Sequence, residues 1–394
     1  MIVSFRASFR AVALALMLFP AMTGSPTAAT AVPADPLARA VQDAVTPVMK
    51  ANGIPGMSVA ITRDGESRVF HFGVSSRASG AAVNDRTLFE VGSVSKTFTA
   101  TLASWAVERG KLSWSDPVGL HLPSLKGSAF GDVHVVHLAT HTPGGLPLQV
   151  PGEVQDDVQL LQWFARWKPE FAPGTRRTYG NPGIGALGLA AANSLGGDFV
   201  TLVEHDLLPA LGMTNTFLNV PESRMADYAQ GYDSDDSLSR LTPGVIWAEA
   251  YGIRTTAADL IRYVQVNMGE RPIDPAWQRA VTATHTGFFT AGSMTQDAAW
   301  EQYAYPVSRR TLLAGNSPKM AFEPNAVTEH RPPMPPRGDV WINKTGSTRG
   351  FSAYVAFVPA RRIGVVVLAN KSSSSADRIK VAFAIMQAME GRPR

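Results

Sequence analysis

The sequence predicts an α+β fold, an α/β sandwich in which helices flank an antiparallel β-sheet formed by N- and C-terminal segments. Strand-like alternation of polar and apolar residues occurs near both ends of the 394-residue chain, and helical patterns bracket both of these regions. The sequence between them is rich in helical patterns, which indicates a mostly helical inserted region over roughly 90–240. Because 45% of the residues are hydrophobic, the chain can bury a sizeable core.

The N-terminal part of this fold is predicted as a helix followed by a hairpin. Residues Pro36–Asn52 have helical periodicity. Residues Met57–Thr62 and Ser67–Phe72 then alternate polar and apolar side chains around Asp64-Gly65, a dipeptide that is typical of a β-hairpin turn.

The C-terminal part is predicted as a second hairpin followed by a second helix. Residues Phe351–Phe357 and Ile363–Leu368 flank the turn Pro359–Arg362, and the second of these segments is apolar enough for a strand buried on both faces. A helix is expected over Asp377–Glu390. The proline-rich segment Arg331–Arg337 fits neither a helix nor a central strand, so we expect a stiff loop there.

Residues 1–31 have the pattern of an export signal peptide. Two arginines precede the apolar run Ala11–Phe19, and small residues follow up to Ala29-Thr30-Ala31. A membrane anchor is the alternative, but the run is too short to span a bilayer. We therefore expect cleavage after Ala31, with Thr27-Ala28-Ala29 as the alternative site. The mature protein, residues 32–394, is expected to be a periplasmic monomer without a stable membrane anchor.

The composition argues against several classes of partner and site. The formal net charge is +4 and falls to +2 without the two arginines of the signal region, and no Lys/Arg-rich run with interleaved aromatic residues is present. We therefore expect no nucleic-acid binding. The chain has no cysteine, which excludes disulfides and thiolate metal sites.

A serine and a lysine three residues apart form the first candidate site. Ser93 and Lys96 fall on one face of a helix predicted to run to Arg109. A serine hydroxyl needs a neighbouring base to become a nucleophile, and the unpaired N–H groups of a first helical turn favour developing negative charge. Taken alone, this pair favours the ordinary interpretation, with Ser93 as a helix N-cap and Lys96 as a solvated side chain, because serine is a preferred cap residue.

Two further motifs supply groups that this chemistry needs. Tyr179-Gly180-Asn181 lies in a polar turn and offers a tyrosine that can act as a base if positive charge lowers its pKa. Lys344-Thr345-Gly346 offers a second ammonium group and a glycine that lets a substrate approach closely. A half-buried aromatic residue and an ordinary turn are the alternatives. The three motifs in this order indicate acyl transfer through a covalent serine ester.

Three histidines raise the alternative of a metal site. His134, His137 and His141 have i, i+3 and i+7 spacing, which would place them on one helix face. No clear fourth ligand accompanies them, and the chain has no His-x-His-x-Asp motif. We expect no metal and no organic cofactor.

The combination resembles class C (AmpC-type) serine β-lactamases, in the superfamily shared with penicillin-binding proteins, for which Ser-x-x-Lys and Lys-Thr-Gly are typical. The resemblance extends through Phe89–Thr99, Leu138–Gln149, Ala248–Gly252 and Leu368–Ser372, and covers the chain from about residue 35 to 378. No glutamate is followed four residues later by asparagine, the pattern that supplies the deacylating base in class A enzymes.

This resemblance implies a role for each catalytic group. Ser93 is expected to be the nucleophile, and Lys96 and Tyr179 the proton-transfer network, with Lys344 as electrostatic support. Backbone N–H groups of Ser93 and Ser347 would form the oxyanion hole.

The resemblance also implies a set of substrate-binding residues. Asn181 and Gln149 would bind the amide of the substrate side chain, and Tyr251 would line the pocket. Thr345, with Lys344 and Arg378, would bind the substrate carboxylate.

The chain departs from the family pattern at a few positions near the predicted pocket. His141 and Pro143 replace the commoner Tyr and Ala, Arg349 replaces a glycine, and Ser375 stands where asparagine is frequent. Carboxylate recognition is therefore less strongly predicted than the acylation groups.

The expected function is hydrolysis of cephalosporins and penicillins through a Ser93 acyl-enzyme. A D-alanyl-D-alanine carboxypeptidase or a carboxylesterase would use the same motifs and is the alternative. A silent binder of β-lactams or cell-wall peptides would not need intact Ser93, Lys96 and Tyr179.

Overall fold

The computed structural model describes residues 1–4 and 35–391. The chain divides into two units, Met1–Asp35 and Pro36–Arg394. The apolar run and the cleavage site of the predicted signal peptide lie outside the described residues. The described helices and strands belong to the second unit.

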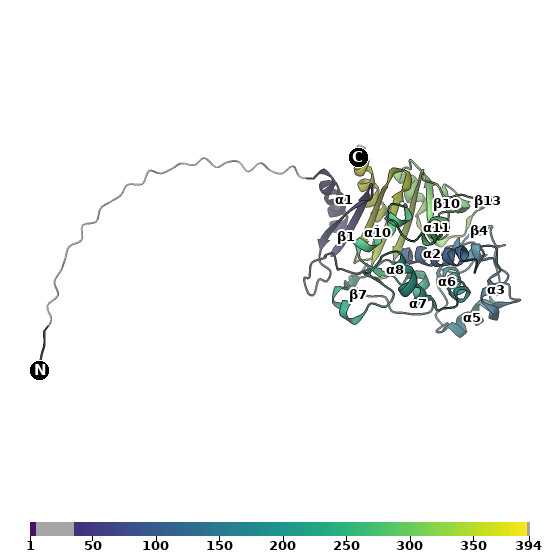
Figure 1. The fold of residues 1–394 in the computed structure, drawn as a ribbon, viewed down its shortest axis with the longest axis horizontal. Coiled ribbons are helices and arrows are strands. Elements are labelled where there is room, and N and C mark those ends of the chain that lie inside the picture. Colours follow the sequence, from purple (N-terminus) through teal and green to yellow (C-terminus); the bar gives the residue numbers. More distant parts are fainter. Residues whose placement is uncertain (5–34, 392–394) are drawn as a thin grey trace. The chain divides into compact units, whose positions relative to one another are not determined.

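A nine-stranded antiparallel sheet forms the centre of this unit (Figure 1). Its spatial order is β13-β9-β10-β11-β14-β15-β16-β1-β2, so β16 from the C-terminal part pairs directly with β1 from the N-terminal part. The predicted α+β class and the sheet shared between both ends of the chain are confirmed. The strands are β1 Gly56–Arg63, β2 Glu66–Gly73, β9 Gly287–Ala291, β10 Met294–Gln296, β11 Glu301–Ala304, β13 Thr328–Met334, β14 Val340–Ser347, β15 Ser352–Val358 and β16 Ile363–Ala369.

Helices cover both faces of the sheet. On one face, α1 (Pro36–Asn52) and α14 (Ser375–Met389) pack on side chains such as Val365 and Val367. On the other face, α2 (Ser95–Glu108), α10 (Ala257–Asn267) and α11 (Pro275–Ala283) share a core with Val366 and Leu368. Because consecutive residues of a strand point to opposite faces, β16 is buried on both, as its apolar sequence predicts.

Helical segments make up most of the regular secondary structure of the inserted region, and within its described part the strands are only two residues long. Its helix α6 (Asn181–Leu195) packs against α2. The other helical segments are α3 Val118–His121, α4 Val135–Ala139, α5 Asp157–Arg166, α7 Phe199–Thr201, α8 Leu208–Ala210 and α9 Trp247–Tyr251, with η1 Gly92–Val94, η2 Pro123–Leu125, η3 Leu202–Leu207 and η4 Glu222–Asp227. The short strands are β3 Phe89–Glu90, β4 Arg176–Arg177, β5 Thr216–Phe217, β6 Gly231–Tyr232, β7 Leu238–Ser239 and β8 Arg254–Thr255. Farther along the chain, α12 Arg309–Gly315, α13 Pro318–Phe322, β12 Asn325–Ala326 and η5 Pro359–Arg361 complete the elements. The division into lobes stays a prediction.

One element differs from the sequence prediction, and for another one alternative is excluded. The proline-rich segment expected to be a loop is largely strand β13, at the edge of the sheet next to β9. The strand is at the sheet edge, and its pairing with β9 shifts register between Glu329 and Met334, so the prolines fall where the ladder is interrupted. Prolines in strands are confined to such edge and bulge positions because they have no N–H to donate. The segment Lys344–Ser347, for which an ordinary turn was the alternative, is the end of strand β14 and pairs with β15.

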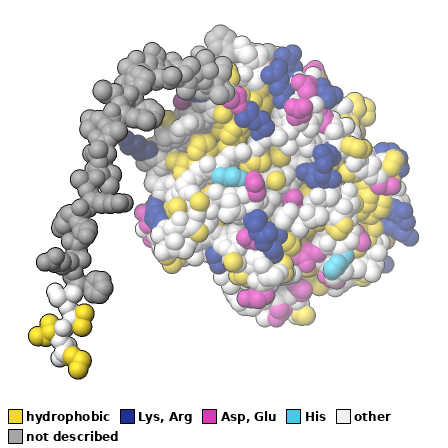
Figure 2. Space-filling view, turned by 60° about the vertical axis from the view of Figure 1, so that its left-hand side comes forward, with side chains coloured by type: hydrophobic (Ala, Val, Ile, Leu, Met, Phe, Trp, Pro, Cys, Tyr) yellow, Lys and Arg dark blue, Asp and Glu magenta, His cyan; other side chains and the backbone are white. Residues whose placement is uncertain are grey.

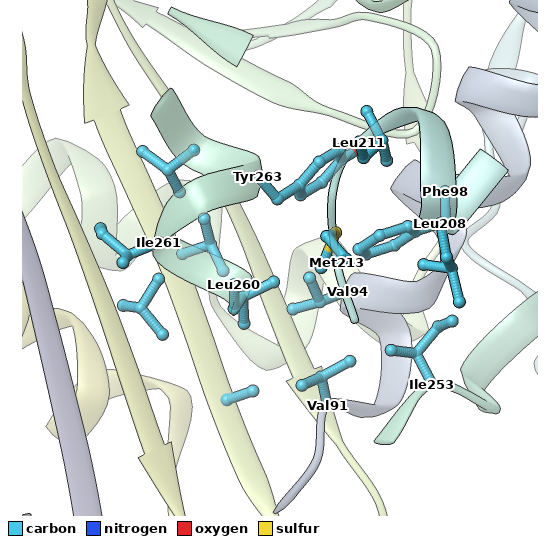
Figure 3. Close-up of a cluster of buried hydrophobic side chains, with 14 of the residues drawn as sticks. Val91, Val94, Phe98, Leu208, Leu211, Met213, Ile253, Leu260, Ile261 and Tyr263 are labelled. Carbon is cyan, nitrogen blue, oxygen red and sulfur yellow. The ribbon is translucent and has the colours of Figure 1, made fainter. Parts of the chain in front are cut away.

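The core next to the sheet anchors the start of α2. Figure 3 shows Val91, Val94 and Phe98 pointing into the same cluster as Leu260 and Tyr263 of α10. All five side chains are buried, so the backbone between residues 91 and 98 is fixed on the sheet side.

Charges are interspersed on the face shown in Figure 2, where basic and acidic side chains alternate over the surface. Among the described residues, no single helix is long and apolar enough to cross a membrane; one bent pair, Asn181–Leu195 with Phe199–Ala210, passes by length and composition only.

Candidate active site

Ser93 lies in the one-turn helix η1, directly before α2. This turn requires a glycine at position 92. Gly92 has a positive φ of 50°, and a Cβ at this position would lie only 2.5 Å from the backbone nitrogen of Ser347. The N-cap of α2 is Val94, without a side-chain cap, so the N-cap alternative for Ser93 is wrong. The Ser93 side chain lines a surface cleft instead.

Lys96 is fully buried one turn after Ser93, so a solvated lysine is also excluded. Its Nζ lies 2.9 Å from Ser93 Oγ, 2.6 Å from Asn181 Oδ1 and 2.8 Å from the carbonyl oxygen of Ala250. Burial lowers the pKa of Lys96 to about 8. This spacing confirms the sequence prediction that the two side chains are within reach of each other, and near neutral pH the amine can exchange a proton with the hydroxyl.

Tyr179 lies between β4 and α6, and its hydroxyl is hydrogen-bonded to Ser93. The centre of its ring is 5.4 Å from Lys96 Nζ and 5.0 Å from Lys344 Nζ. Burial raises the pKa of Tyr179, but the Lys344 and Lys96 ammonium groups and the Ser93 hydrogen bond outweigh burial and lower the pKa to about 8. The three sequence motifs therefore meet at one point.

Strand β14 approaches the nucleophile at backbone distance. A Cβ on Gly346 would lie 1.9 Å from the carbonyl oxygen of Val91 and 3.1 Å from the Ser93 nitrogen. Only glycine fits there, and without a side chain the backbone of β14 packs directly against the backbone of residues 91–94. The two N–H groups predicted to bind an oxyanion, those of Ser93 and Ser347, come from these two adjoining segments.

Two charged residues at the site were not predicted from sequence. Glu301 of β11 accepts a hydrogen bond of 2.9 Å from Arg177 Nη2 and lies 3.9 Å from Lys344 Nζ. Arg177 also lies over the Tyr179 ring, 5.3 Å from its centre. Both residues are buried and line the cleft. Arg177 lies two residues before Tyr179, so its proximity to the site could have been inferred from the sequence. No sequence motif surrounds Glu301, which reaches the site only because β11 pairs with β14.

Both polar and apolar residues line the cleft. The polar residues include Ser93, Tyr179, Lys344, Thr345 and Ser375. The apolar residues are Leu148 and three residues of α13, Met320, Ala321 and Phe322.

A family model named Beta-lactamase matches residues 41–390. The chain belongs to the beta-lactamase family. It is 50% identical over 351 residues to a β-lactamase of Lysobacter lactamgenus, covering 89% of this chain and 91% of the relative. It is 48% identical to a β-lactamase of Pseudomonas fluorescens, covering 89% of this chain and 98% of the relative.

Solved structures of class C β-lactamases have the same fold. One, crystallised in complex with cefoxitin, shares 46% identity and a TM-score of 0.87, with 89% of this chain and 98% of that chain covered. A structure titled D-alanine carboxypeptidase AmpC from Burkholderia cenocepacia shares 52% identity and a TM-score of 0.86, with 89% and 99% covered.

The remaining predicted binding residues of this β-lactamase-family protein lie around the same centre. Asn181 Nδ2 donates to Gln149 Oε1 at 2.8 Å, so the two residues predicted to bind one amide are joined. The Asn181 N–H also donates to the Leu148 carbonyl, which holds the loop against the start of α6. Tyr251 is the last residue of α9, next to the Ala250 carbonyl that accepts from Lys96. Of the residues that line the cleft, none is Asn181, Gln149 or Tyr251, whereas the neighbouring Leu148 is one of them.

The carboxylate role expected for Arg378 does not fit the structure. Arg378 is buried, and all five N–H groups of its guanidinium have protein acceptors: the carbonyls of Gly346, Ala353, Ser373 and Ser374, and the hydroxyl of Ser375. No N–H is left for a substrate carboxylate in this arrangement. Arg378 instead fixes the end of β14 through Gly346 and presents Ser375, which lines the cleft.

Arg349, one of the departures from the family pattern, and the three histidines of the metal alternative lie as follows. Arg349 is 82% exposed and pairs with Asp233 at 3.1 Å, and it is not among the cleft-lining residues. The three histidines do not share a helix face, because α4 ends at Ala139 and His141 follows with a φ of +59°. Within the described part of the chain, no group of three or more His, Asp or Glu residues is arranged to hold a metal ion.

Proposed function

We propose that the chain is a class C serine β-lactamase that opens the ring of cephalosporins and penicillins through an acyl ester on Ser93. The observation that carries the proposal is the contact of Ser93 Oγ with Lys96 Nζ at 2.9 Å, beside a tyrosine that lies between two lysine ammonium groups. Homologues and structural neighbours with the name β-lactamase support it.

In the acylation step, the base takes the proton of the Ser93 hydroxyl as Oγ attacks the lactam carbonyl carbon. The base is the Lys96–Tyr179 pair, which with pKa values of about 8 has lost one proton in part of the molecules at neutral pH. The Ser93 and Ser347 N–H groups stabilise the oxyanion. The C–N bond then breaks, and the lactam nitrogen takes the proton that the pair received.

In the deacylation step, the pair takes a proton from water as its oxygen attacks the ester carbonyl. The bond between Ser93 Oγ and the carbonyl carbon breaks, and the proton returns to Oγ. Because the chain lacks the Glu-x-x-x-Asn pattern, we assign this base role to Tyr179, assisted by Lys96 and Lys344.

Substrate binding follows from the groups around the cleft. Asn181 and Gln149, which are joined by a hydrogen bond, bind the amide of the substrate side chain, and Tyr251 lines the pocket. The carboxylate is bound by Lys344 and the hydroxyls of Thr345 and Ser375, which line the cleft.

The alternative function is a D-alanyl-D-alanine carboxypeptidase or a carboxylesterase. One specific finding favours it as a second activity, since a neighbour with 52% identity is titled D-alanine carboxypeptidase. Both functions form the same acyl ester and differ in the substrate and in the rate at which water reaches the ester.

The proposed location is the periplasm, and the mature protein is proposed to act as a monomer without a membrane anchor. The support is the signal-like pattern of residues 1–31, with its basic start, apolar run and Ala-x-Ala end.

The test is a steady-state assay of the purified mature protein on a chromogenic cephalosporin, a short-chain ester and a D-Ala-D-Ala peptide. The matched control is Ser93→Ala. We expect rapid turnover of the cephalosporin and loss of activity in the control. Stoichiometric acylation without turnover would favour a penicillin-binding protein, and unchanged activity of Ser93→Ala would overturn the mechanism.

A further inference from the structure

His141 is a buried residue that takes no part in the proposed proton transfers. It follows α4 with a φ of +59°, a conformation in which asparagine, aspartate and histidine are enriched. Its carbonyl accepts a 2.8 Å hydrogen bond from the Thr178 N–H, one residue before Tyr179. Its backbone therefore holds the turn that carries the catalytic tyrosine.

The imidazole of His141 packs directly on Tyr179. The two ring centres are 4.4 Å apart, at an angle of 46°. His141 Nδ1 accepts a long hydrogen bond of 3.5 Å from the Gly180 N–H, and Nε2 is buried without a hydrogen bond to any described residue. The ring is thus held by packing more than by its nitrogens.

The surroundings keep this ring neutral. Burial is the largest cause, and the cations Arg177, Lys96 and Lys344 add to it, so that the pKa of His141 lies well below its ordinary value. An uncharged ring at this position excludes water from one side of Tyr179 and adds no charge to the lysine cluster.

We propose that His141 is a positioning residue for the proposed reaction. Its imidazole packs against the Tyr179 ring and keeps that ring between the Lys96 and Lys344 ammonium groups. The inference rests on the proposed function for its kinetic part. In this proposal the aromatic ring of His141 positions Tyr179, and neither its ring nitrogens nor its positive φ is needed for that effect.

Two variants separate these contributions. His141→Phe keeps a ring and loses both nitrogens, whereas His141→Asn suits the positive φ and loses the ring. For turnover of a chromogenic cephalosporin, we expect kcat of His141→Phe to stay within about threefold of the original protein. We expect His141→Asn to lose about 10- to 100-fold in kcat with KM changed by less than about threefold, because misplacing a catalytic group lowers the rate at unchanged binding.

A spectroscopic titration tests the positioning without any substrate. The phenolate absorbance of Tyr179 is obtained as the difference between each protein and its Tyr179→Phe counterpart. The groups that face Tyr179 are Lys96, Lys344, Arg177, Glu301 and His141. We expect a midpoint near 8 in the original protein and in His141→Phe, and a midpoint about one unit higher in His141→Asn, because the phenol leaves the two ammonium groups.

The outcomes are distinct. A His141→Asn variant with unchanged kcat and unchanged midpoint would overturn the proposal, as would a His141→Phe variant that is impaired as much as His141→Asn. A loss of kcat that only follows the folded fraction in thermal melts would overturn it too. If the original protein hydrolyses no β-lactam, the proposed function fails while the titration still decides the role of His141.

Discussion

Replacing Lys344 with methionine removes one of the two ammonium groups beside Tyr179 and fills a similar volume. Lys344 Nζ lies 5.0 Å from the centre of the tyrosine ring. At this distance the attraction between an ammonium group and a phenolate is about 3 kcal/mol if the effective dielectric constant is about 20. One pKa unit corresponds to about 1.4 kcal/mol, so the interaction amounts to about two units before water enters the vacated space.

The sign of the effect follows from the two pKa values. Lys344 lowers the pKa of Tyr179 and also that of Lys96, and both values are now about 8. Without Lys344 both values rise, so the pair loses its first proton at higher pH. We expect the acid limb of the kcat/KM profile for a chromogenic cephalosporin to move up by about one to two units. The variant is then impaired far more at pH 7 than at pH 9.5.

The assay is the pH profile of kcat/KM for the original protein, Lys344→Met and Lys344→Arg. The arginine variant keeps the charge, so its acid limb should stay within about half a unit of the original even if its absolute rate falls. An acid limb that does not move in Lys344→Met would refute the view that this lysine tunes the proton-transfer pair.

Three further substitutions test other parts of the site. Arg177→Met leaves Glu301 buried without its closest cation, and we expect a loss of about 3 kcal/mol in stability, measured by denaturant unfolding; an unchanged midpoint would contradict this. Gly346→Ala places a Cβ 1.9 Å from the carbonyl oxygen of Val91, so β14 must move away from Ser93. We expect kcat in the cephalosporin assay to fall about 100-fold or more. Near-normal turnover would contradict the need for this close approach. Arg378→Lys should lower the thermal midpoint, because the guanidinium donates to protein acceptors that a lysine cannot all reach. We expect KM to change less than about threefold. A tenfold rise in KM would instead indicate that Arg378 contacts the substrate carboxylate.

Much of the fold could be predicted from local sequence patterns. The helix Pro36–Asn52 and the first hairpin lie where the periodicity and the Asp64-Gly65 turn place them. Their signals are local, since side-chain periodicity and turn chemistry need no knowledge of distant residues. Strand β13 was missed because proline argues against strands in general. It is tolerated here because β13 is an edge strand whose pairing with β9 is interrupted at the prolines.

The site was predictable where its residues lie in motifs and not where they depend on tertiary pairing. Ser93 and Lys96 are brought together by helical geometry alone. Glu301 reaches the site only because β11 pairs with β14, with Glu301 opposite Asn343. The hydrogen bonds of Arg378 likewise depend on the turn before α14. The family resemblance implied a carboxylate contact for Arg378, but its guanidinium donates to the turn and to neighbouring strands instead.

The central claim is that Ser93 forms a covalent ester that water then resolves. Rapid-quench mass spectrometry of the mature protein mixed with a penicillin tests it most directly. We predict a transient mass increase equal to the whole penicillin, located on the peptide that contains Ser93, which disappears as the hydrolysed product accumulates. Hydrolysis without any adduct, or an adduct on another residue, would contradict the proposed mechanism.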